Sequence, residues 1–183
     1  MGYSTMKKDH SHFVGPIGGL GGKAANNLAK ETDLAICIGT KLADFTTGSW
    51  ANFENPEFKL VSINIARHDA NKHLAEAVIG DAKVTLTELS NAIGDWKSSD
   101  SWHKKSQVEL KSWNEYVDKE SGPTNQELPS YAHAVGAIYR NSDPTDIAVT
   151  AAGGLVGEVV QVWRPKELNT CLLYTSPSPR DGL

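Results

Sequence analysis

The chain has 183 residues and a formal net charge of −4, with 39% hydrophobic and 22% charged residues. No apolar run approaches the roughly 20 residues needed to cross a bilayer, and the basic residues are scattered among acids, so we expect neither a membrane nor a nucleic-acid partner. The N-terminal MGYSTMKKDHSH has no apolar segment after it, so we expect no secretory signal and a cytoplasmic location.

The first part of the chain alternates helical and strand patterns. The Ala/Leu/Lys-rich stretch Gly22–Thr32 predicts a helix, and the apolar run Leu34–Ile38, closed by Gly39, predicts a buried parallel strand. Residues Lys59–Ile65 alternate apolar and polar side chains and predict a second strand, and a short third strand is expected near Val78. This order predicts an α/β fold with a parallel sheet.

A helix is expected to close this first unit. Thr85 is the predicted N-cap, and Glu88 follows three residues later, as in a capping box. Leu86, Leu89 and Ile93 then fall on one face, which we expect to cover the sheet.

The composition changes between residues 95 and 122. Four apolar residues at helical spacing on a charged background predict a helical connector: Trp102, Leu110, Trp113 and Val117. We interpret the tryptophans as packing anchors and not as a ligand platform.

A second α/β unit begins after Gly122-Pro123. A helix is predicted around Ser130–Arg140, with Tyr131, Val135 and Ile138 in register, and the apolar run Ile147–Thr150 predicts a strand. The sequence AAGGLVGEVVQVW follows that strand and predicts another helix, opened by a glycine pair.

Two glycine-rich helix starts are the candidate binding features. Glycine lets backbone N–H groups approach an anion, and a helix N-terminus adds partial positive charge. The loop Gly15–Gly22 has no strand directly ahead of it and no acidic ribose-binding residue about 20 positions on, so it is either a tight-packing loop or a weak phosphate site. The second start follows a strand and precedes a helix. A phosphate contact and a purely structural helix start are equally good interpretations of it. Its residues are the candidate cofactor-binding set, namely Ala152, Gly153, Gly154 and Leu155.

Other chemistry is sparsely represented. The six histidines show no metal-binding spacing, and no GxSxG nucleophile motif occurs, so we predict no metal site and no catalytic residue in this chain. Asp44 and Asp81 are expected to cap turns. The two cysteines, Cys37 and Cys171, imply no disulfide framework.

Several strings taken together resemble a known family: GPIGGLGGKAANNLAKETDLAICIGTKLADFTTGSW, VSINIARHDANKH, VIGDAKVTLTEL, TNQELP and AAGGLVGEVVQVWRPKELNT. They resemble the thiamine diphosphate-dependent enzymes of the acetolactate synthase type. DFTTGSW, TNQELP and the AAGGL segment resemble most the branch that hydrolyses trihydroxycyclohexane-1,2-dione in inositol breakdown. The resemblance runs from about Ser4 to Thr170.

The resemblance implies a division of the chain into parts of a three-domain enzyme. Residues 1–94 are expected to be an N-terminally truncated central domain, 95–122 a helical connector, and 123–170 the start of the diphosphate-binding domain. Gly18, Gly19 and Gly39-Thr40 match positions that approach a nucleotide in flavin-containing relatives, and we interpret them here as structural. The activating glutamate and the GDG…N magnesium signature have no counterpart in the chain.

The resemblance also implies chemistry. The complete enzyme would use thiamine diphosphate and Mg²⁺ to open a cyclic polyol-derived dione by C–C bond hydrolysis, as a homodimer or homotetramer. The segment itself would be inactive, because its site is divided among domains. The alternatives are a fragment of an acetolactate synthase-like carboligase and a stand-alone nucleotide-binding module.

The final residues break the pattern. The peptide from Cys171 to Asp181 can be encoded by a nucleotide sequence that resembles a transposase adapter used in sequencing-library preparation. We therefore expect residues 171–183 to be an adapter-derived tail without function.

Overall fold

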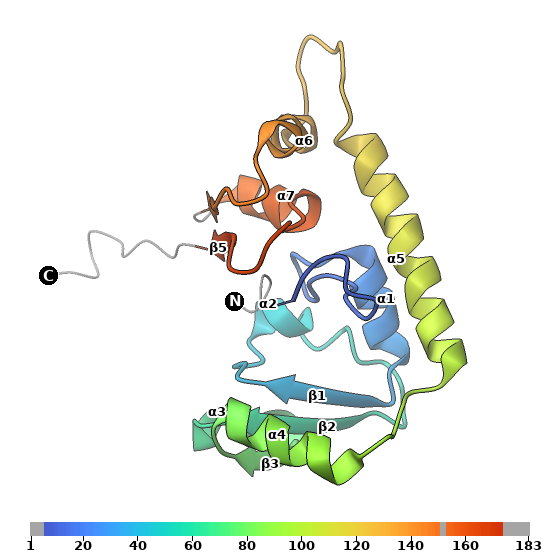
Figure 1. Ribbon diagram of the computed structural model, residues 1–183, viewed down its shortest axis with the longest axis vertical. Helices are drawn as coiled ribbons and strands as arrows, with labels where there is room; N and C mark the ends of the chain where they lie inside the picture. The colour runs from blue at the N-terminus through green and yellow to red at the C-terminus, as the bar shows by residue number, and fades with distance from the viewer. Residues whose placement is uncertain (1–5, 151–152, 174–183) are drawn as a thin grey trace, which may run out of the picture.

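The computed structural model describes residues 6–150 and 153–173 of the chain, and it combines helices with two sets of parallel strands (Figure 1). The larger sheet has the strand order β1-β2-β3, formed by β1 (Leu34–Ile38), β2 (Lys59–Asn64) and β3 (Glu76–Ile79). A separate parallel pair joins β4 (Ala148–Thr150) to β5 (Cys171–Leu173). The predicted α/β fold with parallel strands is confirmed.

Seven α-helices and one 3₁₀ helix are described in these residues. They are α1 (Lys23–Glu31), α2 (Asp44–Thr47), α3 (Arg67–Ala70), the 3₁₀ helix η1 (Lys72–Leu74), α4 (Ala82–Ile93), α5 (Asp100–Glu120), α6 (Tyr131–Asn141) and α7 (Gly154–Val162). In the described part of the chain, no helix combines the length and apolar character that a membrane span needs.

The larger sheet is covered unequally on its two faces. The central strand β2 is well packed, because Ser62 and Ile63 are almost completely buried. In β1, by contrast, Leu34, Ile36 and Ile38 are 41–44% exposed on one face. The expectation of a fully buried β1 is therefore wrong: an apolar cavity of about 560 Å³ separates this face from α4.

The start of α4 differs from the prediction. Asp81 is the N-cap, and its side chain accepts hydrogen bonds from the backbone N–H groups of Lys83 and Val84 at 3.0 and 3.1 Å. Thr85 lies inside the helix, so the predicted Thr85 cap is wrong. Asp81, four residues earlier, accepts from the otherwise unsatisfied N–H groups of the first turn, so the helix begins about one turn before the predicted position.

The connector helix α5 joins the two halves of the structure (Figure 1). Its N-terminal part packs on α1, and its C-terminal part contacts α6 and α7. Val117 belongs to a buried cluster with Val135, Val162 and Trp163, and Trp113 packs against that cluster. For Trp113, the predicted role as a packing anchor is confirmed.

The buried face of α6 is rotated from the predicted stripe. Tyr131 and Ile138 are 65% and 63% exposed, whereas Val135 and Gly136 are buried. The reason is a close helix contact at Gly136, where an added Cβ would lie 2.1 Å from the Ser121 carbonyl oxygen. The side that approaches the end of α5 is thus set by a residue without a side chain, and the apolar pattern did not include it.

The C-terminal strand falls where the sequence predicted an irregular tail. Cys171–Leu173 pairs in register with β4, so three apolar residues extend the chain as a strand. Residues 174–183 lie outside the described residues. The adapter origin of 171–183 and the proposed domain boundaries stay predictions.

Candidate functional site

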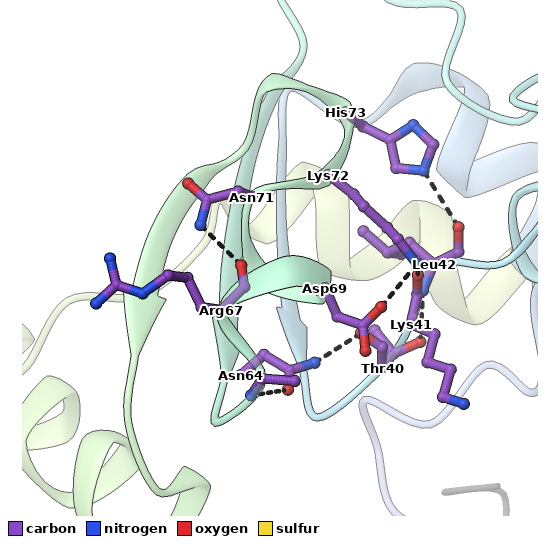
Figure 2. A network of polar contacts seen from close by, with 10 residues as sticks. Thr40, Lys41, Leu42, Asn64, Arg67, Asp69, Asn71, Lys72 and His73 are labelled. Carbon is purple, nitrogen blue, oxygen red and sulfur yellow. Dashed lines mark hydrogen bonds and ion pairs between the residues drawn. The ribbon is translucent and has the colours of Figure 1, made fainter.

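The loops that follow β1 and β2 meet at the carboxyl end of the larger sheet, which is where ligands bind in open parallel sheets (Figure 2). Asn64, the last residue of β2, joins the two loops. Its amide nitrogen donates to the Thr40 carbonyl at 3.0 Å, and its amide oxygen accepts from the Ala66 N–H at 2.9 Å. Asn64 is only 8% exposed, so this link is shielded from water.

Lys72 makes a second link between the same loops. Its ammonium group donates to Asp69 Oδ1 at 2.6 Å and to the Lys41 carbonyl at 3.2 Å (Figure 2). The hydrogen bond from Lys72 lowers the pKa of Asp69 below its ordinary value of 3.8, and the positive charges of Lys72, His68 and Lys41 act in the same direction. Asp69 is therefore ionised at neutral pH.

His73 closes the network over the loop after β1. A ring nitrogen, Nε2, lies 3.2 Å from the Leu42 carbonyl, and the imidazole stacks on the Trp50 indole with ring centres 4.1 Å apart. Leu42, Trp50 and His73 all have positive φ angles, of 46°, 69° and 58°. Residues other than glycine rarely adopt this backbone conformation, so the three residues, which contact one another through His73, are strained at one place. Strained backbone of this kind clusters at functional sites.

A cavity of about 600 Å³ adjoins this edge of the sheet. Cys37, Thr40 and Leu42 line it from the strand side, and Trp102 and His103 line it from α5. The walls are mainly apolar. Burial raises the pKa of the Cys37 thiol, so it remains protonated and is a poor nucleophile.

The described residues at this edge can hold a ligand but show no catalytic constellation. Within the described part of the chain, no group of three His, Cys, Asp or Glu side chains is arranged to hold a metal ion. Asp44 accepts a hydrogen bond from Ser49 Oγ at 3.2 Å and Asp81 caps α4, so both act in turns as predicted.

The first glycine-rich start is closed by its own protein contacts. The Gly18 N–H donates to Asn26 Oδ1 at 2.8 Å, and the Gly19 N–H donates to the Phe45 carbonyl at 2.8 Å. The N–H groups of Gly21 and Gly22 also donate to carbonyls of the same loop. These four N–H groups are already satisfied, which favours the tight-packing interpretation over a phosphate site.

Close contacts support the same interpretation. A Cβ added at Gly18 would lie 2.1 Å from the Phe45 carbonyl oxygen, and one at Gly22 would lie 2.8 Å from the Trp113 indole nitrogen. Gly39 has a φ of 61°, and its N–H donates to the Ile63 carbonyl at 2.9 Å. Gly39 thus turns the chain out of β1, in agreement with a structural role.

The second glycine-rich start is open. Gly153 precedes α7 with a φ of 118°, and nothing lies within 4 Å of a Cβ built at Gly153 or Gly154. Leu155 is 46% exposed, and Ala152 lies outside the described residues. The structure does not bring this start together with the network at the sheet edge, because the two belong to different halves joined by α5 (Figure 1). Its cofactor contact stays a prediction.

The sequence did not point to the residues of the sheet-edge network. Asn64 is one of the polar residues of the alternating second strand, Lys72 and His73 lie in the stretch after it, which has no periodicity, and Trp50 lies in a turn. The one available pointer was their position after two predicted parallel strands, since the carboxyl ends of such strands meet at one edge.

Comparison with known proteins finds a family match over the first part of the chain. Residues 1–89 match the family described as thiamine pyrophosphate enzyme, central domain. The match covers just under half of the 183-residue chain. The three-stranded parallel sheet and the sheet-edge network both lie within the matched residues. The match supports thiamine diphosphate as the cofactor of the protein.

The chain is also similar to proteins named 3D-(3,5/4)-trihydroxycyclohexane-1,2-dione hydrolase. It is 31% identical to the protein of Clostridium perfringens (strain 13 / Type A) over 88% of the chain and 29% of the relative. It is 34% identical to a Bacillus anthracis protein, and 33% to one of Bacillus cereus (strain AH820), in both cases over 92% of the chain and 30% of the relative. The chain spans about 30% of the length of these relatives.

Proposed function

We propose that this chain is a segment of a thiamine diphosphate-dependent hydrolase that opens a trihydroxycyclohexane-1,2-dione at a C–C bond in myo-inositol catabolism. The observation that carries the proposal is the 31–34% identity to proteins of that name over about nine-tenths of the chain, which extends well past the central domain. In this proposal, residues 123–170 begin the diphosphate-binding domain. The complete protein acts in the cytoplasm as a homodimer or homotetramer.

The open start of α7 fits a diphosphate group. Gly153 and Gly154 leave the backbone unobstructed, and the N-terminus of a nine-residue helix carries unsatisfied N–H groups and partial positive charge. Ala152, Gly153, Gly154 and Leu155 would therefore hold the diphosphate in the complete protein, and Mg²⁺ would supply positive charge to balance it. When bound, thiamine diphosphate supplies an electron sink for the carbanion that C–C cleavage leaves.

The central domain would supply position and not chemistry. Its sheet-edge residues Asn64, Lys72 and His73 fix the loops after two strands, and their hydrogen bonds go to backbone groups and to Asp69, not to a nucleophile. We therefore assign no catalytic residue to this segment. A segment of this extent is expected to be inactive alone, because a site shared among domains needs all of them in place.

The decisive experiment restores the complete protein. The coding sequence on both sides of this segment is recovered, the protein is expressed with thiamine diphosphate and Mg²⁺, and its ring opening of the dione is compared with its condensation of pyruvate. We expect ring opening. Pyruvate condensation without ring opening would assign the segment to a carboligase, and flanks without an activating glutamate and a GDG…N motif would contradict both.

A cofactor titration tests the α7 contact separately. In the complete protein, Gly154→Asp places a carboxylate where the diphosphate would lie, and we expect at least tenfold weaker thiamine diphosphate binding by calorimetry. Thr87→Asp adds the same charge at an exposed position of α4 and serves as the control. Equal cofactor affinity in the two variants would remove α7 from the cofactor site while leaving the hydrolase assignment intact.

A further inference from the structure

A cluster of positive side chains surrounds Tyr139 of α6. The Lys8 ammonium donates to the Tyr139 hydroxyl at 2.8 Å and lies 5.6 Å from the ring centre. The Arg164 guanidinium and the Lys166 ammonium lie 5.8 and 4.9 Å from the same ring centre. Three cations from the N-terminal segment and from the segment after α7 therefore converge on one aromatic ring.

The positive charge of this cluster is only partly compensated. Arg164 forms an ion pair with Asp118. Lys8 and Lys166 bond neutral oxygens, the Tyr139 hydroxyl and the Ser142 carbonyl at 2.7 Å, and neither forms an ion pair within the described part of the chain. Two lysine charges thus remain without a carboxylate partner, and a bound anion would lower their mutual repulsion.

Lys8 and Arg164 also line one small cavity. The cavity has a volume of about 160 Å³ and includes the amide side chains of Asn114 and Gln161 on its wall. In liquid water one molecule occupies about 30 Å³, so the cavity has room for a tetrahedral oxyanion together with water. The buried Nε of Arg164 has no acceptor within the described residues, although other guanidinium nitrogens bond Asn114 and Asp118. Because this Nε exposes less than 1 Å² of surface, it is not a contact for the anion, and Arg164 contributes the positive charge of its guanidinium at the wall.

We propose that this cavity binds a phosphate dianion between Lys8 and Arg164, with Lys166 adding favourable charge nearby. The dianion is either inorganic phosphate or the phosphate of a small monoester. Arginine presents several N–H donors in a geometry that matches phosphate oxygens, and lysine adds a point charge. The site does not include Gly153 or Gly154, and it is independent of the proposed reaction.

Asp9 allows a test in which binding should become stronger, because this acidic residue lines the same cavity. A negative charge there weakens the binding of an anion, so removing it must strengthen binding. Lys7 is the matched control for Lys8. It is the adjacent residue and carries the same charge, but it is paired with Glu167 at 2.9 Å and does not line the cavity.

The experiment is a calorimetric titration of the 183-residue chain with inorganic phosphate at constant ionic strength. We expect saturable binding at one site, weakened about tenfold by Lys8→Gln, strengthened about threefold by Asp9→Asn and changed less than about twofold by Lys7→Gln. Far-ultraviolet circular dichroism of each variant checks that its fold is unchanged.

Three results would overturn the proposal. They are the absence of saturable phosphate binding, an equal loss of affinity in Lys7→Gln and Lys8→Gln, and acetate binding as tight as phosphate binding. The first would leave no site, the second would indicate a diffuse charge effect, and the third would contradict a preference for a dianion. A parallel titration with methyl phosphate separates the two sources: affinity equal to phosphate supports a monoester, and weaker affinity supports the free ion.

Discussion

The two glycine-rich helix starts have similar sequences and opposite surroundings. Before α1, the N–H groups of Gly18 and Gly19 already donate to protein acceptors, and a Cβ at Gly18 would collide with a backbone oxygen. Before α7, neither Gly153 nor Gly154 has an atom within 4 Å of an added Cβ. Glycine permits close approach at both places, but at the first the approaching group is the protein itself. A glycine-rich start is therefore a binding site only where its donors remain available.

Gly18→Ala should have the largest effect on this comparison. The φ of 106° disfavours any side chain, and the new methyl group would lie 2.1 Å from the Phe45 carbonyl oxygen. We expect a loss of about 3–5 kcal/mol in the free energy of unfolding, measured by urea denaturation of the chain. A loss below about 1 kcal/mol would show that the loop before α1 is as open as the one before α7.

Asn26→Ala should open the closed loop without adding bulk. The Asn26 amide oxygen accepts from the Gly18 N–H at 2.8 Å and from the Asn52 amide at 3.1 Å, so its removal takes an acceptor from both donors. The Gly18 carbonyl loses the bond from Asn26 but keeps the one from the Gly21 N–H. We expect a loss of about 2–3 kcal/mol in the free energy of unfolding. Asn27→Ala, the neighbouring amide with a single bond to Glu109, is the control and should cost less than about 1 kcal/mol. Equal losses would mean that the bonds to Gly18 do not hold the loop.

Alanine at the open start should be tolerated better. Gly153→Ala strains a φ of 118° but meets no atom, so we expect a loss of about 1–2 kcal/mol, and Gly154→Ala should be neutral within about 0.5 kcal/mol. Thermal denaturation of Gly153→Ala, Gly154→Ala and Gly18→Ala should rank their melting temperatures, with Gly18→Ala the lowest and Gly154→Ala the highest. A collapse of stability in Gly154→Ala would show that the start of α7 is filled and not open.

Asp69→Asn should have a small effect that depends on pH. The pKa of Asp69 is lowered in the folded protein, so its ionised form stabilises the fold above about pH 4, and this contribution is lost as the pH falls through the folded pKa. We expect the melting temperature of the native chain to exceed that of Asp69→Asn at neutral pH and the difference to shrink below pH 3.8. Asp95→Asn, at an exposed loop position, controls for net charge. A difference that persists unchanged to about pH 3 would exclude the ion pair with Lys72 as its cause.

The fold was predictable where the pattern is repetitive. Alternation of Val61, Ile63 and polar neighbours predicted β2, and the structure confirms that strand to within one residue. Details that depend on a single contact were not predictable. Asp81 instead of Thr85 caps α4, and Gly136 turns the buried face of α6 away from the predicted stripe. The cap of α4 and the buried face of α6 each depend on a contact whose partner cannot be located from sequence spacing.

The candidate site shows the same division. The glycine content of the sequence indicated both helix starts as candidates. Only the hydrogen bonds between Gly18 and Asn26 show that the first is a packed loop and not a binding site. Asn64 and Lys72 were missed because their partners, Thr40 and Lys41, lie on the loop after another strand. Contacts across a sheet edge depend on strand order, which a single sequence leaves open.

The length of the connector helix α5 also fixes how the two halves are rotated relative to each other about the helix axis. Its 21 residues span about 32 Å; Glu109, near the middle, is bonded to Asn27 of α1, and Asp118, near the C-terminal end, is bonded to Arg164. Inserting one residue between these two positions would turn everything beyond it by about 100° and shift it by about 1.5 Å. Lys8 of the N-terminal segment would then no longer face Tyr139 of α6, whereas an insertion of seven residues would nearly restore the angle. The separation of the halves is thus adjustable only in whole turns of this helix.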